Sequence, residues 1–173
     1  DWVEGDKADI AQPKVLKKHI SYLASDELQG RLTGSAGEKK AADYIVKEFK
    51  SLGLNPYANK SYLQTFNYKV KINPHSTDAS SDKANSGTNV IAFLDNKASK
   101  TIVIGAHYDH LGLNEHNHSS KPNSQGEIHN GADDNASGVA AVLELARMYS
   151  QNKTKENVNY IFALFSGEED GLI

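Results

Sequence analysis

The sequence has no cysteine among its 173 residues, which excludes disulfides, thiolate metal sites and a cysteine nucleophile. It also lacks an uninterrupted apolar run of about 18 residues, the length that a membrane-spanning helix needs. The formal net charge is −3, and no long run of lysine or arginine is present. We therefore expect no nucleic-acid partner and no membrane span. Any bound metal must be held by histidine and carboxylate side chains.

The composition, 38% hydrophobic and 24% charged, is typical of a globular protein, and we assign residues 1–173 to one domain. Apolar residues recur at helical spacing in three segments, which predicts helices there: 12–24, 36–52 and 137–151. Short continuous apolar runs predict strands that are covered on both faces: 89–94, 101–106 and 160–165. This alternation predicts an α/β fold.

Two segments between the second helix and the first buried strand are more polar. Residues 63–72 alternate between apolar and polar side chains, which predicts an edge or antiparallel strand. Residues 73–87 are rich in serine, aspartate and asparagine, which predicts an exposed loop. In the first helix, His19 lies on the apolar face and is predicted to belong to the core.

Three polar clusters lie where these elements end or begin. Residues 107–110 follow the second buried run, Asp133 and Asp134 precede the third helix, and Glu168 and Glu169 follow the last run. Ligands of open α/β sheets bind at the carboxyl ends of strands. Two adjacent carboxylates are costly to bury unless a cation compensates them, and zinc binds histidine nitrogen and carboxylate oxygen. The alternatives are an ordinary helix cap at Asp133–Asn135 and a solvated turn at residues 168–169.

Other hydrolase classes fit this chain less well. A metallo-β-lactamase type of site needs another histidine two residues before His107, where the chain has Gly105. A serine hydrolase needs a Gly-x-Ser-x-Gly elbow, which the residues around Ser166 do not provide. A glycine-rich phosphate loop is also absent from the sequence.

The three clusters, in this order, resemble the co-catalytic di-zinc aminopeptidases, family twenty-eight of the metallopeptidases. The matching motifs are Ala106–Gly112, Gly131–Gly138 and Ser166–Glu169, and Gly30–Ser35 is similar to the N-terminal portion of the family. The resemblance implies a three-layer α/β/α sandwich with a mostly parallel mixed sheet, of the zinc-dependent exopeptidase type and incomplete at the C-terminus. The loop at 73–87 is too short for a protease-associated insert.

The resemblance also implies a role for each polar residue. His107 would bind one zinc ion, Glu169 would bind the other, and Asp134 would bridge the two. Glu168 would be the general base of a metal-assisted hydrolysis, and Asp109 would orient His107. The peptide bond after the bridging aspartate is often cis in the family.

The activity implied is that of a zinc metallopeptidase with two ions, which releases N-terminal amino acids from peptides with a free N-terminus. The family also implies an extracytoplasmic location, periplasmic or secreted. Its members supply a further aspartate and histidine ligand after the second glutamate, which this chain does not reach. We therefore expect residues 1–173 alone to bind zinc weakly and to be inactive, which isothermal titration would test.

Two alternatives keep the same fold. One is a glutaminyl-cyclase-like acyltransferase with a single zinc ion, although the cyclases depart from the Asp134–Gly138 motif. The other is a non-catalytic relative, which the joint presence of the five site residues disfavours. Four histidines have no assigned role: His110, His116, His118 and His129. We expect His110 and His129 to support ligands or to face solvent.

Overall fold

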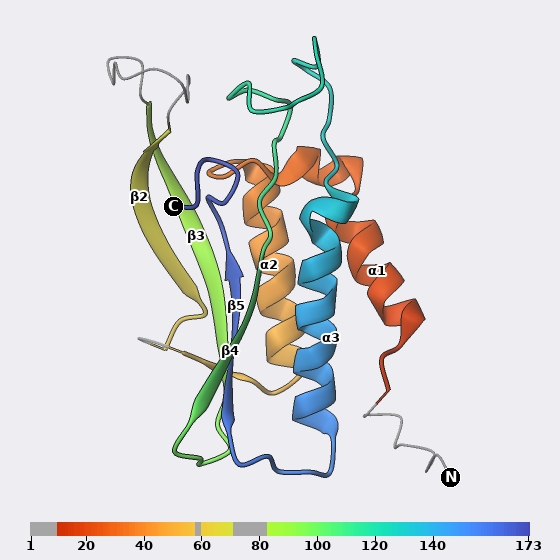
Figure 1. Ribbon diagram of the computed structural model, residues 1–173, viewed down its shortest axis with the longest axis vertical. Coiled ribbons are helices and arrows are strands. Elements are labelled where there is room, and N and C mark those ends of the chain that lie inside the picture. The colour runs from red at the N-terminus through yellow and green to blue at the C-terminus, as the bar shows by residue number, and fades with distance from the viewer. Residues whose placement is uncertain (1–9, 58–59, 71–82) are drawn as a thin grey trace.

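The described residues form one mixed sheet with three α-helices packed on one of its faces (Figure 1). The computed structural model describes residues 10–57, 60–70 and 83–173. The strands are β1 (Asn55–Pro56), β2 (Leu63–Val70), β3 (Lys83–Leu94), β4 (Thr101–His107) and β5 (Asn159–Phe165). The helices are α1 (Pro13–Leu23), α2 (Ala36–Ser51) and α3 (Ser137–Gln151), with short helical turns η2 (Asp26–Arg31) and η4 (Ala132–Ala136) before α2 and α3.

The sheet order is β1-β3-β5-β4, and β2 pairs with β3 beside β1. Strand β5 is antiparallel to β3 and parallel to β4, with His107 opposite Phe165 in the parallel pair. Helix α3 makes the crossover between β4 and β5, as parallel neighbours require. The carboxyl ends of β4 and β5 therefore meet at one edge of the sheet.

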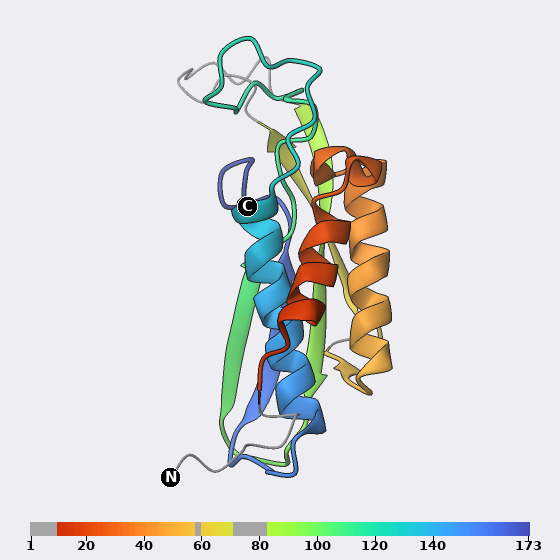
Figure 2. The ribbon, with the colours of Figure 1, turned by 90° about the vertical axis from the view of Figure 1, so that its right-hand side faces the viewer.

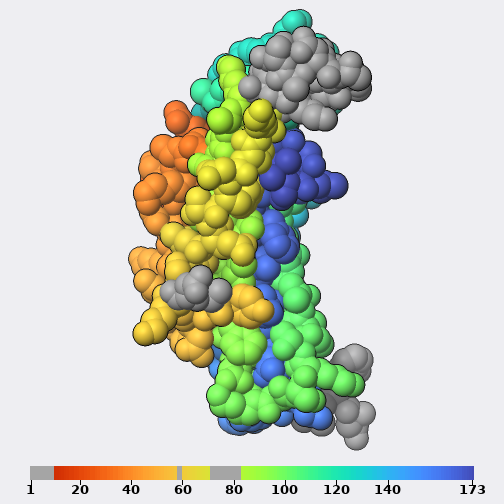
Figure 3. All heavy atoms as spheres, turned by 90° about the vertical axis from the view of Figure 1, so that its left-hand side faces the viewer, coloured from red at the N-terminus to blue at the C-terminus, as the bar shows by residue number. Residues whose placement is uncertain are grey.

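The predicted α/β fold with a mixed sheet is present, but two details of the prediction differ. Among the described residues, β4 and β5 form the only parallel pair, so this sheet is not mostly parallel. Figure 2 shows the helices in front of the sheet, and Figure 3 shows the opposite face without a covering helix. The apolar runs suggested cover on both sides, yet Val103 and Phe165 are 60% and 42% exposed. The described residues thus form two layers.

The polar segment before the first buried run is partly strand. Residues 83–87 belong to β3 and pair with residues 66–70 of β2, so the loop prediction was wrong there. Strand pairing uses backbone groups, and polar side chains are accepted where the strand faces water. The remainder of the predicted loop, 73–82, lies outside the described residues. The predicted alternating strand is β2.

The core lies between the sheet and the helices. Phe49 of α2 packs against Phe162 of β5 with ring centroids 6.4 Å apart, and Leu143 of α3 is buried beside them. Helix α2 begins where Ser35 Oγ accepts the N–H of Glu38 (3.1 Å), and Gly53 follows its end at φ +70°, as a C-terminal cap. All three predicted helices are confirmed. No helix among the described residues combines the length and apolar character that crossing a membrane requires.

His19 is a core residue, as predicted, and its pKa gives stability a pH dependence. It is 3% exposed, its Nδ1 lies 2.6 Å from the Tyr44 hydroxyl, and burial lowers its pKa below the usual 6.5. Below pH 6.5 the unfolded chain gains a proton that the folded chain does not, so stability falls as pH drops toward the lower folded pKa. The variant His19→Gln should lose less stability than wild type in this window.

Urea unfolding at about pH 7.5 and about pH 5.5 measures the effect as a difference between the two proteins, which cancels the contribution of other titrating groups. Equal losses of unfolding free energy in wild type and His19→Gln would show that His19 titrates normally in the folded chain.

Candidate metal centre

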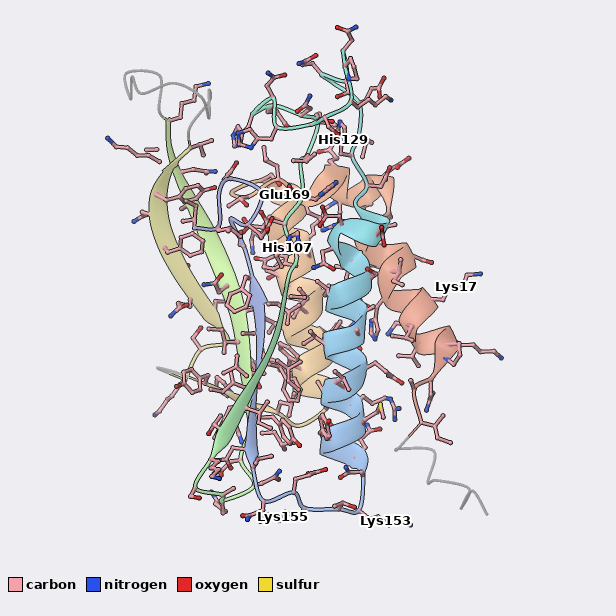
Figure 4. The ribbon with its side chains drawn as sticks, viewed as in Figure 1. Lys17, His107, His129, Lys153, Lys155 and Glu169 are labelled. Carbon is pink, nitrogen blue, oxygen red and sulfur yellow. The ribbon has the colours of Figure 1, made fainter. Side chains whose placement is uncertain are left out.

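The predicted ligands meet at the end of β4 and β5. His107 is the last residue of β4, and its Nε2 lies 3.0 Å from Asp134 Oδ1 and 3.9 Å from Glu168 Oε2. Figure 4 shows His107 and Glu169 together at this end of the sheet. His107, Asp134 and Glu169 each offer one ligand atom, and these atoms all lie within 4.8 Å of one another. Residues far apart in the sequence thus converge on one small volume.

Asp134 lies within the helical turn η4, which leads directly into α3. The peptide bond between Asp134 and Asn135 is cis, as expected. Asn135 Oδ1 accepts the N–H of Gly138 in the first turn of α3 at 2.9 Å, so Asn135 makes the capping contact. The Asp134 side chain is 65% exposed and faces His107. The alternative of an ordinary helix cap therefore accounts for Asn135 but not for Asp134.

Asp109 is fully buried behind the site and links three segments. Its Oδ1 lies 3.6 Å from His107 Nδ1, and its backbone carbonyl oxygen lies 3.3 Å from the same nitrogen. Its carboxylate also accepts the Thr33 hydroxyl (3.0 Å) and the backbone N–H groups of Glu168 and Glu169 (3.3 Å each). Asp109 therefore faces the imidazole, as the predicted orienting role requires, and also fixes the turn that carries both glutamates.

A buried arginine contacts both loops that carry predicted ligands, the one after His107 and the one before Asp134. Arg31 is 0% exposed and donates to the carbonyl oxygens of Tyr108 (2.7 Å), Asn130 (2.8 Å) and Gly131 (3.0 Å). Tyr108 adjoins His107, and Gly131 begins the segment that leads to Asp134. In the sequence, the segment Gly30–Ser35 was noticed only because it resembles the family. Its local pattern does not show which groups the Arg31 guanidinium contacts.

Gly30, the neighbour of Arg31, explains why the loop can approach so closely. It has φ +70°, and a Cβ at this position would lie 2.5 Å from the carbonyl oxygens of Gly112 and His129. Any side chain here would push the loops apart. The glycine is required by both conformation and space.

The charges of the site favour a cation. Burial by itself would lower the pKa of His107, but Asp109, Glu168 and Asp134 outweigh it and raise this pKa to about 9. Burial raises the pKa of Glu168, helped by the nearby Glu169, while His107 opposes the shift. Carboxylates thus outnumber positive groups around the imidazole, and one imidazole with two carboxylates is a donor set that suits zinc.

The segment that carries these residues matches a known family. The sequence model of Peptidase family M28 covers residues 89–173, which include His107, Asp134, Glu168 and Glu169. Residues 89–173 therefore belong to peptidase family M28. The resemblance seen in the three sequence motifs is confirmed.

Two relatives show what share of a longer protein's length this chain covers. It is 32% identical over 143 residues to the alkaline phosphatase isozyme conversion protein of Escherichia coli K12, covering 82% of this chain and 39% of the relative. It is 33% identical over 89 residues to a probable leucine aminopeptidase of Trichophyton verrucosum, covering 49% of this chain and 21% of the relative. The chain thus spans less than half the length of these relatives.

The structural comparison concerns the fold alone. A crystal structure of Porphyromonas gingivalis glutaminyl cyclase superposes with a TM-score of 0.70 at 22% identity, covering 93% of this chain and 49% of the cyclase. Glutaminyl cyclases and zinc exopeptidases were predicted above to share one fold. This likeness agrees with that fold class.

The other histidines of the segment 89–173 have defined surroundings. His110 is 9% exposed, and its Nδ1 lies 2.5 Å from Glu169 Oε1, so it supports a predicted ligand. His129 Nε2 lies 3.2 Å from Ser124 Oγ. His116 and His118 were given no role in the sequence analysis, yet both lie beside Asp170. The His-x-His spacing and the aspartate directly after Glu169 are the sequence signals that could have identified this group.

Proposed function

We propose that the M28 protein containing this chain is a zinc aminopeptidase that releases N-terminal amino acids from peptides with a free N-terminus, using two zinc ions. The convergence of His107, Asp134 and Glu169, with Glu168 alongside, carries the proposal. The chain's similarity to a probable leucine aminopeptidase supports the choice of substrate.

Three side chains would hold the metal ions. His107 and Glu169 would each bind one ion, and Asp134 would be shared, in line with the family resemblance. The observed spacing of their ligand atoms and the surplus of carboxylates fit this role. Zinc bound there would polarise the substrate carbonyl and lower the pKa of a bound water to about 7.

Glu168 is placed to transfer the proton. Its carboxylate stands 3.9 Å from His107 Nε2, and its side chain is 37% exposed, so water and substrate can reach it. Burial raises its pKa above the usual range of glutamate, which makes it a stronger base than an exposed carboxylate. Glu168 would accept a proton from the attacking water and donate it to the leaving amine. Asp109, through the backbone N–H groups of residues 168 and 169, keeps this carboxylate in position.

The second candidate is a glutaminyl-cyclase-like acyltransferase, which the fold similarity to the Porphyromonas gingivalis cyclase favours. The Asp134–Gly138 motif favours the peptidase, because the cyclases depart from it. A non-catalytic relative is disfavoured, because all five predicted site residues are present and adjacent.

Metal content and two assays distinguish these reactions. We expect the candidate metal centre of the full-length protein to bind two zinc ions, and we expect the protein to release nitroaniline from aminoacyl-nitroanilides and to leave N-terminal glutamine peptides uncyclised. Removing zinc with a chelator should abolish hydrolysis, and adding zinc should restore it, since the metal supplies the polarised water. Cyclisation of glutamine peptides by a protein with one zinc ion in this centre would establish the acyltransferase instead.

We also propose an extracytoplasmic location for the protein, by analogy with the family. Fractionation of the source cells with an antibody against this chain tests it, and recovery with a cytoplasmic marker would contradict it.

A further inference from the structure

A second group of metal-ligating side chains lies beside the candidate metal centre and shares no residue with it. Among the residues that the structure describes, His116, His118 and Asp170 each offer one ligand atom, and these atoms lie within 4.8 Å of one another. The two histidines come from the long loop after β4, and Asp170 comes from the turn after β5. Neither the family assignment nor the proposed reaction uses them.

The three side chains are largely shielded from water. The exposed fractions are 15% for His116, 14% for His118 and 2% for Asp170. Asp170 Oδ1 lies 2.8 Å from His116 Nδ1 and 3.5 Å from His118 Nδ1. Two imidazoles thus point a nitrogen at the same carboxylate oxygen, which a simple ion pair does not require.

These separations are close to those in a zinc site. Ligand atoms arranged tetrahedrally about zinc, at bond lengths of about 2.0–2.2 Å, lie roughly 3.3 Å apart. The contact between His118 and Asp170 already has this spacing, and the contact between His116 and Asp170 needs to open by a few tenths of an ångström. Two histidines and one carboxylate are also a protein ligand set that zinc uses with a water as fourth ligand.

The surroundings of Asp170 support metal binding as well. The Tyr68 hydroxyl of β2 donates to Asp170 Oδ2 and leaves Oδ1 directed at the histidines. Hydrogen bonds of this kind fix the orientation of ligating carboxylates in metal sites. Asp170 is therefore held with one oxygen toward the two imidazoles.

We propose that His116, His118 and Asp170 bind a further divalent transition-metal ion, with zinc as the first candidate. This ion joins the loop after β4 to the turn that carries Glu168 and Glu169. His118 Nδ1 also lies 3.0 Å from the carbonyl oxygen of Glu169, so the two sites are neighbours in space. Metal binding at this nitrogen would replace its hydrogen bond to the carbonyl. We assign the ion a structural role, because it joins the loop to the turn and none of its three ligands belongs to the candidate metal centre.

Zinc content of full-length variants tests the proposal separately from the proposed function. The background variant is Asp134→Asn, which weakens the candidate catalytic centre. After dialysis against micromolar zinc and gel filtration, this protein should keep one zinc ion per chain by elemental analysis. Adding His116→Asn and His118→Asn should remove that ion, since asparagine can still donate to Asp170 but is a poor zinc ligand. The matched control adds His129→Gln instead, which should leave the zinc content unchanged.

Two further measurements distinguish misfolding of the asparagine variant from the loss of its metal ligands. Circular dichroism should show equal folding of the asparagine variant and its parent without zinc, and added zinc should raise the Tm only of proteins with both histidines. Replacing zinc by cobalt should give visible absorption that the asparagine variant lacks. If the Asp134→Asn protein binds no zinc, or if the asparagine variant keeps the same amount, the further metal site is wrong. If wild type and Asp134→Asn bind the same single ion and the asparagine variant loses it, the two-zinc catalytic centre fails while this site stands.

Discussion

Substituting Glu168→Gln in the full-length protein is expected to lower kcat by roughly 10²–10⁴-fold, the usual contribution of a general base. Glutamine keeps the size of the side chain but cannot accept the proton from water. The backbone contacts from Glu168 and Glu169 to Asp109 are unaffected, so fold and zinc content should stay as in wild type. Steady-state kinetics with an aminoacyl-nitroanilide, together with elemental analysis, measure both quantities.

The matched control for this experiment is Glu127→Gln. Glu127 is 52% exposed and forms an ion pair with Lys121 on the loop after β4, so its loss should change kcat little. Undiminished hydrolysis by Glu168→Gln would remove the assigned base and favour a different mechanism. A drop in zinc content would instead assign Glu168 to metal binding.

The second large effect concerns stability. Substituting Arg31→Met should lower the free energy of unfolding by at least about 3 kcal/mol, because each buried carbonyl left unpaired costs about 1–3 kcal/mol. Arg31 is fully buried and donates to carbonyl oxygens on both ligand-bearing segments, including those of Tyr108 and Gly131. Burial lowers its pKa only to about 10, so the guanidinium remains charged at neutral pH. Urea unfolding measures the loss.

Lys17→Met is the matched control, because Lys17 lies on the outer side of α1 (Figure 4). Its stability should stay within about 0.5 kcal/mol of wild type, as is usual for surface substitutions. A similarly small change for Arg31→Met would mean that water replaces the guanidinium among these carbonyls. A stable Arg31→Met protein with reduced zinc content would show that the residue positions the centre more than it stabilises the fold.

The sequence predicted most elements because their patterns are local. The helices at 12–24, 36–52 and 137–151 and the buried strands have repeating apolar positions, and the structure places helices and strands there. The pairing of the strands was harder to predict from the sequence, because it depends on which strands become neighbours in the folded sheet. The polar residues 83–87 illustrate this, since they extend β3 only through pairing with β2.

The site shows the same division between local and distant information. His107, Asp134 and Glu169 were predicted because each ends or begins an element in a recognisable motif. Their individual roles stay predictions, although the structure brings them together. The contacts of Arg31 could not be predicted, because its partners lie on other loops and the sequence contains no pattern for them. The His-x-His spacing of His116 and His118 is visible in the sequence, but it does not show that Asp170 is their partner.

The separation between the two ends of the sheet has a practical consequence. The candidate metal centre lies at the carboxyl ends of β4 and β5. The connections at 95–100 and 152–158 lie at the opposite end of the sheet, where Figure 4 shows Lys153 and Lys155. Exposed connections remote from a site tolerate added sequence best. A purification tag, fluorescent label or surface tether attached at that end should leave the candidate metal centre open, which makes it the preferred place for immobilising the protein.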